Sequence, residues 1–349
     1  MRAQILAAVF LLGAFAAYAQ DTSTPQPSQM KDPRAILAAA APFYDFNDPA
    51  LKPWHLKATY QLYDDKGNPS EQGTFEYWWA SPKVYRVSWS RPSATQTTWH
   101  TADSKYAYSA TGKPLDYFEK DLQLNLFSPL PSTDAIDPSK IHLIRNDVEL
   151  GSTRYPCVSE SPRKSVEPSD FRTLPTECLD PTLPVLSFEL HFLGIVATNY
   201  DNVVKIQGKY LARAIAVVVG NKKLLTATVD SIDSLDPASP AIVPSKDAIF
   251  EPDAEQAAEK AENGLLIKKQ LPESPLTPGV QLFPSTILIE VTIGVDGKVK
   301  DPHVIFSTSP WFSASTLKAI SGWEYKPYLR NGIPIEVRTV ITLAIWPFH

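Results

Sequence analysis

Residues 286–299 read TILIEVTIGVDGKV, and this stretch decides how the last part of the chain is interpreted. Isoleucine or valine stands at every second position: Ile287, Ile289, Val291, Ile293 and Val295. A period of two is typical of a strand that buries one face. Asp296-Gly297 follows, a pair that accepts the positive φ of a tight hairpin turn. The pattern predicts a half-buried strand, a turn, and a returning strand over 298–306.

A helix and a further strand are predicted after this hairpin. Helical spacing relates three apolar residues: Ala314, Leu317 and Ile320. Ser313 is the candidate N-cap of this helix. Asn331-Gly332 predicts another turn, and residues 333–346 alternate again. The expected order is strand, Asp-Gly turn, strand, helix, Asn-Gly turn, strand.

Four features in this order resemble the C-terminal domain of the TonB family. They are VTIGVDGKV at 291–299, the A-x-x-x-W helix end at 319–323, W-x-Y-x-P at 323–327, and N-G-x-P-I-x-V at 331–337. The resemblance implies a small β-β-α-β domain within residues 265–349. The sequence departs from the family at Leu282-Phe283-Pro284, where a Tyr-Pro pair is frequent, and at Ser321-Gly322, where basic residues are frequent. These departures weaken the inference that the domain transduces energy.

The resemblance also implies that the domain binds protein. Domains of this family bind a short segment of an outer-membrane transporter, which adds to an edge strand. The residues expected to form this partner-binding edge are Ile335, Glu336, Val337, Arg338, Thr339, Val340 and Ile341. Alternation places Glu336 and Arg338 on the polar face of the strand, with Val337 and Ile341 toward the core. The expected partner is an outer-membrane or periplasmic protein.

The composition excludes some functions for the chain as a whole. Its 349 residues are enough for two domains. A net charge of -5 argues against nucleic acid as a partner, because nucleic-acid-binding proteins usually carry a basic patch. Aromatic residues make up 11% of the chain, which favours strands over disorder.

The N-terminus has the pattern of a signal peptide. Arg2 supplies a positive charge, residues 5–16 are apolar, and Ala17-Tyr18-Ala19 matches an A-x-A cleavage site. The apolar run is shorter than the roughly 20 residues of a spanning helix. A cleaved signal peptide over 1–19, and a periplasmic or secreted protein, are therefore expected. The alternative is an uncleaved leader that anchors the chain in the inner membrane.

Cys157 and Cys178 are the two cysteines of the chain. In an exported protein such a pair predicts one disulfide. The segment between them is rich in proline and has little apolar periodicity, so it needs a cross-link. A metal-binding pair is the alternative, but no histidine lies nearby at ligand spacing. No metal site is predicted.

Strands dominate residues 51–250. The candidate strands are 56–63, 73–80, 84–90, 96–101, 105–109, 185–192, 203–207, 213–219, 224–232 and 242–250. Candidate helices are 33–41, with Asp32 as N-cap, and 115–127. A meander with one or two helices resembles the half-barrel of the outer-membrane lipoprotein carriers. An unclassified β-rich domain is the alternative.

The adjacent residues Trp78 and Trp79 must point to opposite faces of their strand. One can pack in the core, and the other then faces solvent or a groove that binds something apolar. Packing of both in the structure is the alternative, because aromatic residues dominate the cores of sheets.

The sequence therefore predicts an α+β protein with an antiparallel β-rich domain followed by a TonB-like domain. The expected division is signal peptide 1–19, lead-in 20–50, β-rich domain 51–250, linker or start of the next domain 251–284, and TonB-like domain 285–349. Nucleophile-elbow, phosphate-loop, zinc-protease and dinucleotide motifs are missing. A non-enzymatic envelope protein without a cofactor is expected. The alternative functions are a periplasmic carrier that binds a lipid or other apolar ligand in the β-rich domain, and a purely structural protein.

Overall fold

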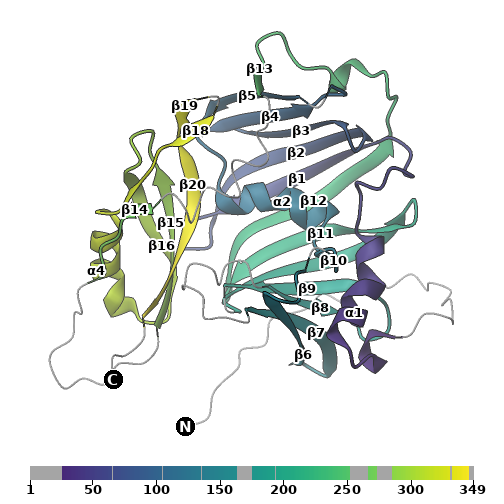
Figure 1. Cartoon of the computed structure of the whole chain (residues 1–349), viewed down its shortest axis with the longest axis horizontal. Coiled ribbons are helices and arrows are strands. Elements are labelled where there is room, and N and C mark those ends of the chain that lie inside the picture. The colour runs from purple at the N-terminus through teal and green to yellow at the C-terminus, as the bar shows by residue number, and fades with distance from the viewer. Residues whose placement is uncertain are drawn as a thin grey trace.

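The computed structural model describes residues 26–64, 66–103, 105–134, 136–162, 175–192, 194–251, 266–272, 285–330 and 332–345. In these residues a large curved sheet lies beside a smaller unit built from the C-terminal strands (Figure 1). The architecture is mainly antiparallel β with few helices, which confirms the predicted fold class. No helix in the described ranges combines the length and the apolar character that crossing a membrane requires.

Thirteen described strands form the large sheet. They are β1 (Trp54–Tyr63), β2 (Pro69–Ser81), β3 (Val84–Arg91), β4 (Ala94–His100), β5 (Tyr106–Gly112), β6 (Ile141–Leu150), β7 (Thr153–Pro162), β8 (Thr176–Leu179), β9 (Leu186–His191), β10 (Val196–Ile206), β11 (Lys209–Val219), β12 (Lys222–Ser234) and β13 (Ile249–Glu251). Their order is β13-β5-β4-β3-β2-β1-β12-β11-β10-β9-β8-β7-β6. The sheet is therefore two meanders joined where β1 pairs with β12, from Trp54 opposite Ser234 onward.

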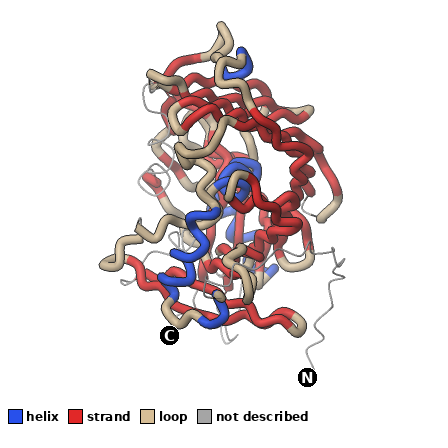
Figure 2. Tube along the Cα trace, turned by 90° about the vertical axis from the view of Figure 1, so that its right-hand side faces the viewer, coloured by secondary structure: helices blue, strands red, loops and turns tan. Residues whose placement is uncertain are grey.

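In the described part of the chain two α-helices lie with this sheet, which curves around the helical segments (Figures 1 and 2). The helix α1 (Pro33–Ala40) begins as predicted, with the Asp32 side chain accepting from the Arg34 amide. The helix α2 (Tyr117–Phe127) begins with a capping box: the Asp116 side chain accepts from the amides of Phe118 and Glu119, and the Glu119 side chain accepts from the Asp116 amide. Short 3-10 turns are η1 (Pro27–Gln29), η2 (Ala41–Phe43) and η4 (Pro240–Ile242).

The main core lies between the sheet and these helices. Its largest fully buried side chains include Trp54, Trp79, Tyr60, Phe75, Leu122 and Leu126. Glu119 is also fully buried, and it is stabilised by the Tyr60 hydroxyl at 2.8 Å and the Arg91 guanidinium at 2.8 Å. A buried carboxylate with partners of this kind is tolerated where an unpaired one would not be. The hydrogen bond from Tyr60 fixes the first turn of α2 against β1, and the ion pair with Arg91 fixes it against β3.

In the described residues, the C-terminal unit contains one three-stranded sheet, two short strand pairs and one helix. Its elements are β14 (Leu266–Lys268), β15 (Ser285–Ile293), β16 (Val299–Ser307), α4 (Pro310–Ile320), β17 (Glu324–Tyr325), β18 (Tyr328–Arg330), β19 (Ile333–Ile335) and β20 (Val337–Ile345). The sheet has the order β16-β15-β20, while β14 pairs with β17 and β18 with β19. The predicted Asp-Gly hairpin is present: Gly297 has φ +76°, and the Gly294 amide donates to the Lys298 carbonyl at 2.9 Å.

The strand β15 is buried on both faces, whereas alternation predicted burial of one. Ile287, Ile289, Val291 and Ile293 pack with α4 in the C-terminal core. On the opposite face Leu288 is fully buried and belongs to the main core, together with Val340 of β20. The C-terminal sheet therefore lies between α4 and the large unit. Val295, expected in the buried row, is 47% exposed because β15 ends at Ile293.

The predicted disulfide between Cys157 and Cys178 is present. The expectation of an irregular proline-rich loop around it was only partly right. No strand was predicted between residues 128 and 184, yet β6, β7 and β8 lie there, and the disulfide joins two residues directly opposite each other on β7 and β8. Both cysteines are fully buried beside Phe188. Residues 163–174 lie outside the described residues.

Two smaller predictions need correction. Ser313 is not the N-cap of α4: the helix begins at Pro310, with Ser309 ahead of it, because proline is favoured in the first turn. The strand expected over 242–250 is present only at its end, as β13 (Ile249–Glu251). The helical bias at 251–263 falls almost wholly outside the described residues, as does the predicted signal peptide.

The two adjacent tryptophans do lie on opposite faces of β2. Trp79 is 1% exposed in the main core. Trp78 packs on the other face, stacked on His55 at 4.6 Å between ring centres, with the Arg86 guanidinium 4.2 Å above its ring. It is 9% exposed, so it lines no open groove. The alternative of core packing is the better description of both residues.

Candidate ligand cavity and candidate partner-binding edge

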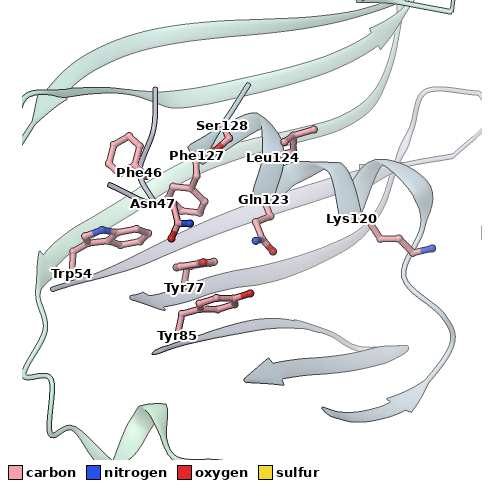
Figure 3. A pocket seen from close by; sticks show the side chains of 10 residues that line it. All are labelled: Phe46, Asn47, Trp54, Tyr77, Tyr85, Lys120, Gln123, Leu124, Phe127 and Ser128. Carbon is pink, nitrogen blue, oxygen red and sulfur yellow. The ribbon is translucent and has the colours of Figure 1, made fainter. Parts of the chain in front are cut away.

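A cavity of about 280 Å³ lies between α2 and the first strands of the large sheet. Its lining residues come from the segment before β1, from β1, β2 and β3, and from α2: Phe46, Asn47, Trp54, Tyr77, Tyr85, Lys120, Gln123, Leu124, Phe127 and Ser128. Figure 3 shows Trp54, Tyr77 and Tyr85 along the sheet side, and Gln123 reaching toward the two tyrosines from α2. The volume is close to the lower limit of about 300 Å³ for small-molecule sites.

The aromatic rings of the cavity belong to a row that crosses neighbouring strands. Trp54 stacks on Tyr77 with ring centres 5.1 Å apart, and Tyr77 stacks on Tyr85 at 5.6 Å. The row continues from Tyr85 to His100 and Tyr106. Alternation brings these side chains to one face of the sheet, and the pairing of β1 to β5 sets them side by side. The sheet thus offers one continuous aromatic surface at the cavity.

Few polar groups of the described residues point to a bound ligand. The Asn47 side chain accepts a hydrogen bond from the indole of Trp79 at 3.2 Å. The indole N–H of Trp54 is buried and has no hydrogen-bond partner. A buried donor without a partner is uncommon in native structures and carries a cost. Leu124, in contrast, is 56% exposed and forms an apolar part of the cavity rim.

Among the ten described residues that line the cavity, Lys120 is the one with a charged side chain. Figure 3 places its ammonium group at the end of the cavity farther from Trp54, directed away from the aromatic rings. Its Nζ donates to the backbone carbonyl of Arg338 at 2.8 Å. The helix α2 therefore contacts the C-terminal unit with the residue that also closes one end of the cavity.

The residues predicted to form the partner-binding edge do not form one continuous strand. Ile335 ends β19 and lies opposite Tyr328 of β18. Glu336 stands between β19 and β20, exposed, with its carboxylate 2.7 Å from the Lys300 ammonium. The remaining five, Val337 to Ile341, are in β20, which is the last strand of its sheet order in the described part of the chain. Val337 and Ile341 face the C-terminal core, as predicted.

Arg338 lies on the polar face of its strand, but this face is covered by the large unit. Its guanidinium lies 2.7 Å from Glu290 and 3.8 Å from Asp116, at the N-terminus of α2. Glu290 is 4% exposed, and His303 of β16 lies 3.1 Å from the same carboxylate oxygen. The polar face of the strand pair therefore meets the large unit. Alternation identified this face correctly but could not show what covers it.

The charges in this contact shift one another's pKa values. Burial, with the nearby Glu290 carboxylate, raises the pKa of Asp116 to about 7. Burial also opposes ionisation of Glu290, but the hydrogen bond from His303 and the charge of Arg338 hold its pKa below the ordinary value. The hydrogen bond to Glu290 raises the pKa of His303. The charges of these groups, and with them the contact between the two units, therefore depend on pH.

Sequence reasoning missed the cavity because its lining residues come from separate strands and one helix. Only the aromatic content of the strands was a signal, and it drew attention to Trp78 and Trp79 instead of Trp54, Tyr77 and Tyr85. No group of three or more His, Cys, Asp or Glu able to hold a metal ion occurs in the described ranges.

Comparison with known proteins supports the C-terminal prediction. Residues 285–344 match the family model described as Gram-negative bacterial TonB protein C-terminal, which confirms the resemblance for this segment. No curated protein matches the chain.

Solved structures that match part of the chain include a LolA superfamily protein from Nitrosomonas europaea. The two chains are 8% identical with a TM-score of 0.36, over 58% of this chain and 93% of that one. A DUF1329 family protein from Desulfovibrio piger is 7% identical with a TM-score of 0.38, over 58% of this chain and 91% of the other.

Proposed function

We propose that the protein is a non-enzymatic envelope protein that binds an apolar ligand in the cavity beneath α2. The observation that carries this proposal is the cavity itself, with five aromatic side chains among its ten lining residues and an exposed leucine at its rim. Concave apolar sites with a few polar groups are the usual form of small-molecule sites. The C-terminal unit then serves as the part of the molecule that contacts a protein partner.

The location in the cell envelope is supported by three observations. The C-terminal segment matches a family described as Gram-negative. A buried disulfide joins β7 and β8, and disulfides persist in oxidising compartments such as the periplasm. The first nineteen residues have the pattern of a signal peptide. Together they favour a periplasmic or secreted protein.

The ligand proposal is tested with a neutral apolar fluorophore, N-phenyl-1-naphthylamine. We expect saturable binding with increased fluorescence. In Gln123→Trp a large ring would fill the cavity, since Gln123 reaches toward Tyr77 and Tyr85, and binding should weaken at least about tenfold. The control Gln29→Trp places the same ring at an exposed position in η1 and should leave binding unchanged. Equal binding by both variants would show that the dye binds elsewhere.

A second candidate function is partner binding by strand addition to β20. It is supported by the family match and by the position of β20 at the end of its sheet order. The Arg338 carbonyl accepts from Lys120 and so points away from β15. Because N–H and C=O of one strand residue point to the same side, the Arg338 amide faces the same edge. An added strand would have to displace the Lys120 contact.

This second function is tested with Arg338→Pro and Arg338→Ala. Both variants lose the ion pair with Glu290, and only the proline variant also loses the outward backbone donor. The measurement is binding of synthetic peptides that represent the extended segments of outer-membrane transporters, by fluorescence polarisation. We expect the alanine variant to bind and the proline variant to lose binding. Equal binding by two folded variants would place the partner site elsewhere.

A further inference from the structure

We infer that the protein forms a dimer in which β6 (Ile141–Leu150) pairs antiparallel with β6 of a second copy, about a twofold axis at Asn146. The two large sheets then become one continuous sheet. This interaction surface is separate from the cavity beneath α2 and from β20. Its occupant follows from the backbone, the charges and the apolar side chains of one edge strand.

The strand β6 is an open and unprotected edge. It is the last strand in the order of the large sheet, and in the described part of the chain it pairs with β7, without a register shift. Proteins usually protect an open edge with a proline, a lysine, a bulge or a very short strand. The opposite edge is protected by shortness, because β13 has three residues. The strand β6 has ten residues and contains neither proline nor lysine.

Prolines in β7 show which backbone groups of β6 point outward. Pro156 has no N–H and lies opposite Asp147. A proline in a paired strand stands where its nitrogen faces away from the neighbour. Glu160, four residues on, likewise turns its amide away from β6, and donates to the Pro175 carbonyl at 3.2 Å. Alternation therefore directs the backbone N–H and C=O groups of every second residue of β6 away from β7. The outward groups belong to Leu143, Arg145, Asp147 and Glu149, and they have no hydrogen-bond partner in the described ranges.

The charges of β6 select one register for pairing with itself. A twofold axis places one residue opposite its own copy, and like charges directly opposite each other destabilise a strand pair. Arg145 or Asp147 on the axis would create such a contact, whereas Asn146 between them is uncharged. With Asn146 on the axis, Arg145 lies opposite Asp147 of the second copy, and the reverse pair forms on the other side. Asn146 is near the middle of β6, so this register also uses most of the strand.

The same register joins these charges into one network. Within a chain the Arg145 guanidinium lies 3.1 Å from Asp147, and Arg154 of β7 lies 2.8 Å from the same carboxylate. Opposite residues of an antiparallel pair lie about 5 Å apart. The Arg145–Asp147 pairs of the two copies are therefore neighbours at the junction, where each carboxylate meets a second guanidinium.

This register also buries apolar surface on the other face of the strand. Ile144 is 38% exposed, and it comes opposite Val148 of the second copy. Val148 packs against the buried cluster of Cys157, Cys178 and Phe188. Ile144 would extend this cluster across the junction. Backbone groups, charges and apolar side chains thus favour the same pairing, which is why the occupant is a second copy of this chain.

The experiment is sedimentation velocity of the full chain over a range of concentrations. We expect the sedimentation coefficient to rise with concentration from the value of a monomer to that of a dimer. Asn146→Glu and Asn146→Lys each place like charges on the axis, so each should weaken self-association at least about tenfold. An equimolar mixture of the two variants sets Glu opposite Lys and should restore the dimer. The control Asn146→Gln, at the same exposed position, should behave as the unsubstituted protein.

A second pair of variants tests the backbone of the edge. Glu149→Pro removes an outward N–H, and the control Glu149→Ala keeps it. We expect the proline variant to remain a monomer at concentrations where the alanine variant is a dimer, with circular dichroism showing that both are folded. Three results would overturn the inference. They are a monomer at every concentration, a mixture that associates no better than its two components, and equal dimerisation by the two Glu149 variants.

Discussion

Arg338 and Glu290 form an ion pair, 2.7 Å long, on the face of the C-terminal sheet that meets α2. Thr292 is the residue opposite Arg338, so the pair is diagonal across β15 and β20. The Glu290 side chain is 6% exposed and that of Arg338 23%. One oxygen of Glu290 has no hydrogen-bond partner among the described residues. The buried Glu290 carboxylate is therefore stabilised by its contacts with Arg338 and His303.

Removal of Arg338 should destabilise the protein more than removal of a surface charge. We expect Arg338→Met to lower the free energy of unfolding by about 3 kcal/mol, because it leaves Glu290 buried with His303 alone. The matched control is Lys300→Met, which breaks the 2.7 Å pair with Glu336 at side chains 44% and 38% exposed. The control should cost less than about 1 kcal/mol. Urea unfolding monitored by circular dichroism measures both, and equal costs would contradict the buried-pair interpretation.

The contact between the two units should weaken as pH rises, first over the range from 3.8 to about 7 that Asp116 sets, and then above 6.5 as His303 loses its proton. The pKa of His303 is raised above its ordinary 6.5, so its stabilising charge is complete below 6.5 and is lost as pH passes through the raised pKa. The pKa of Asp116 is raised from 3.8 to about 7, so between these pH values the folded protein keeps a proton that the unfolded chain loses, and stability falls as pH rises. Both effects have the same sign.

The pH dependence also has a lower limit. The pKa of Glu290 is held below its ordinary 4.5, so its contribution is lost as pH falls through that lowered pKa. Urea midpoints across this range should therefore pass through a maximum between the two regimes. In His303→Gln the decline above pH 6.5 should flatten. An unchanged decline in that variant would show that other groups cause it.

The disulfide should contribute several kcal/mol to stability. Cys157 and Cys178 are separated by 21 residues, for which the chain-entropy model gives about 3 kcal/mol. We expect a Cys157→Ala/Cys178→Ala double variant to lose about this amount in urea unfolding. The reduced unsubstituted protein should behave in the same way. If reduction leaves stability unchanged while the double variant is destabilised, the lost stability comes from packing in the core beside Phe188 and not from the cross-link.

Gly297 should not tolerate a side chain. It has φ +76°, and a Cβ there would collide with the backbone carbonyl of Tyr325, whose amide donates to the Gly297 carbonyl at 2.8 Å. We expect Gly297→Ala to cost about 2 kcal/mol or more. Gly151→Ala is the control: its φ is +62°, but no atom lies within 4 Å of the added Cβ. Gly151→Ala should cost about 1 kcal/mol, because it adds only the strain of a positive φ at a residue with a Cβ. Thermal unfolding compares the two.

Alternation and turn residues predicted most individual elements, because both are local properties of the chain. The strands around Tyr60, the Asp296-Gly297 hairpin and the helix containing Leu122 were all found in this way. The strand β8 was missed because it has only four residues, and β7 because Pro156 interrupts its pattern. Such strands form because neighbouring strands provide the backbone groups with which they hydrogen-bond.

The sites were harder to predict than the elements, because they depend on contacts between segments far apart in the sequence. Alternation placed Arg338 on a polar face, but its partners Glu290 and Asp116 come from another strand and from the other unit. Trp54 and Tyr85 become neighbours of one cavity only through the order of β1, β2 and β3. The cysteine pair was predictable because it rests on residue type and count alone.

The joining of the two meanders has a consequence for how the protein reaches this structure. Each meander pairs strands that are close in the sequence, and such contacts form early and fast. The junction of β1 with β12 instead connects Trp54 with Ser234, a contact of high sequence separation. During synthesis or export, β1 has only β2 beside it until β12 has emerged. Its edge, with Leu56 and Tyr60, is then exposed to other chains. A chaperone that covers this edge would protect the nascent protein from aggregation at the point where the sheet is last to close.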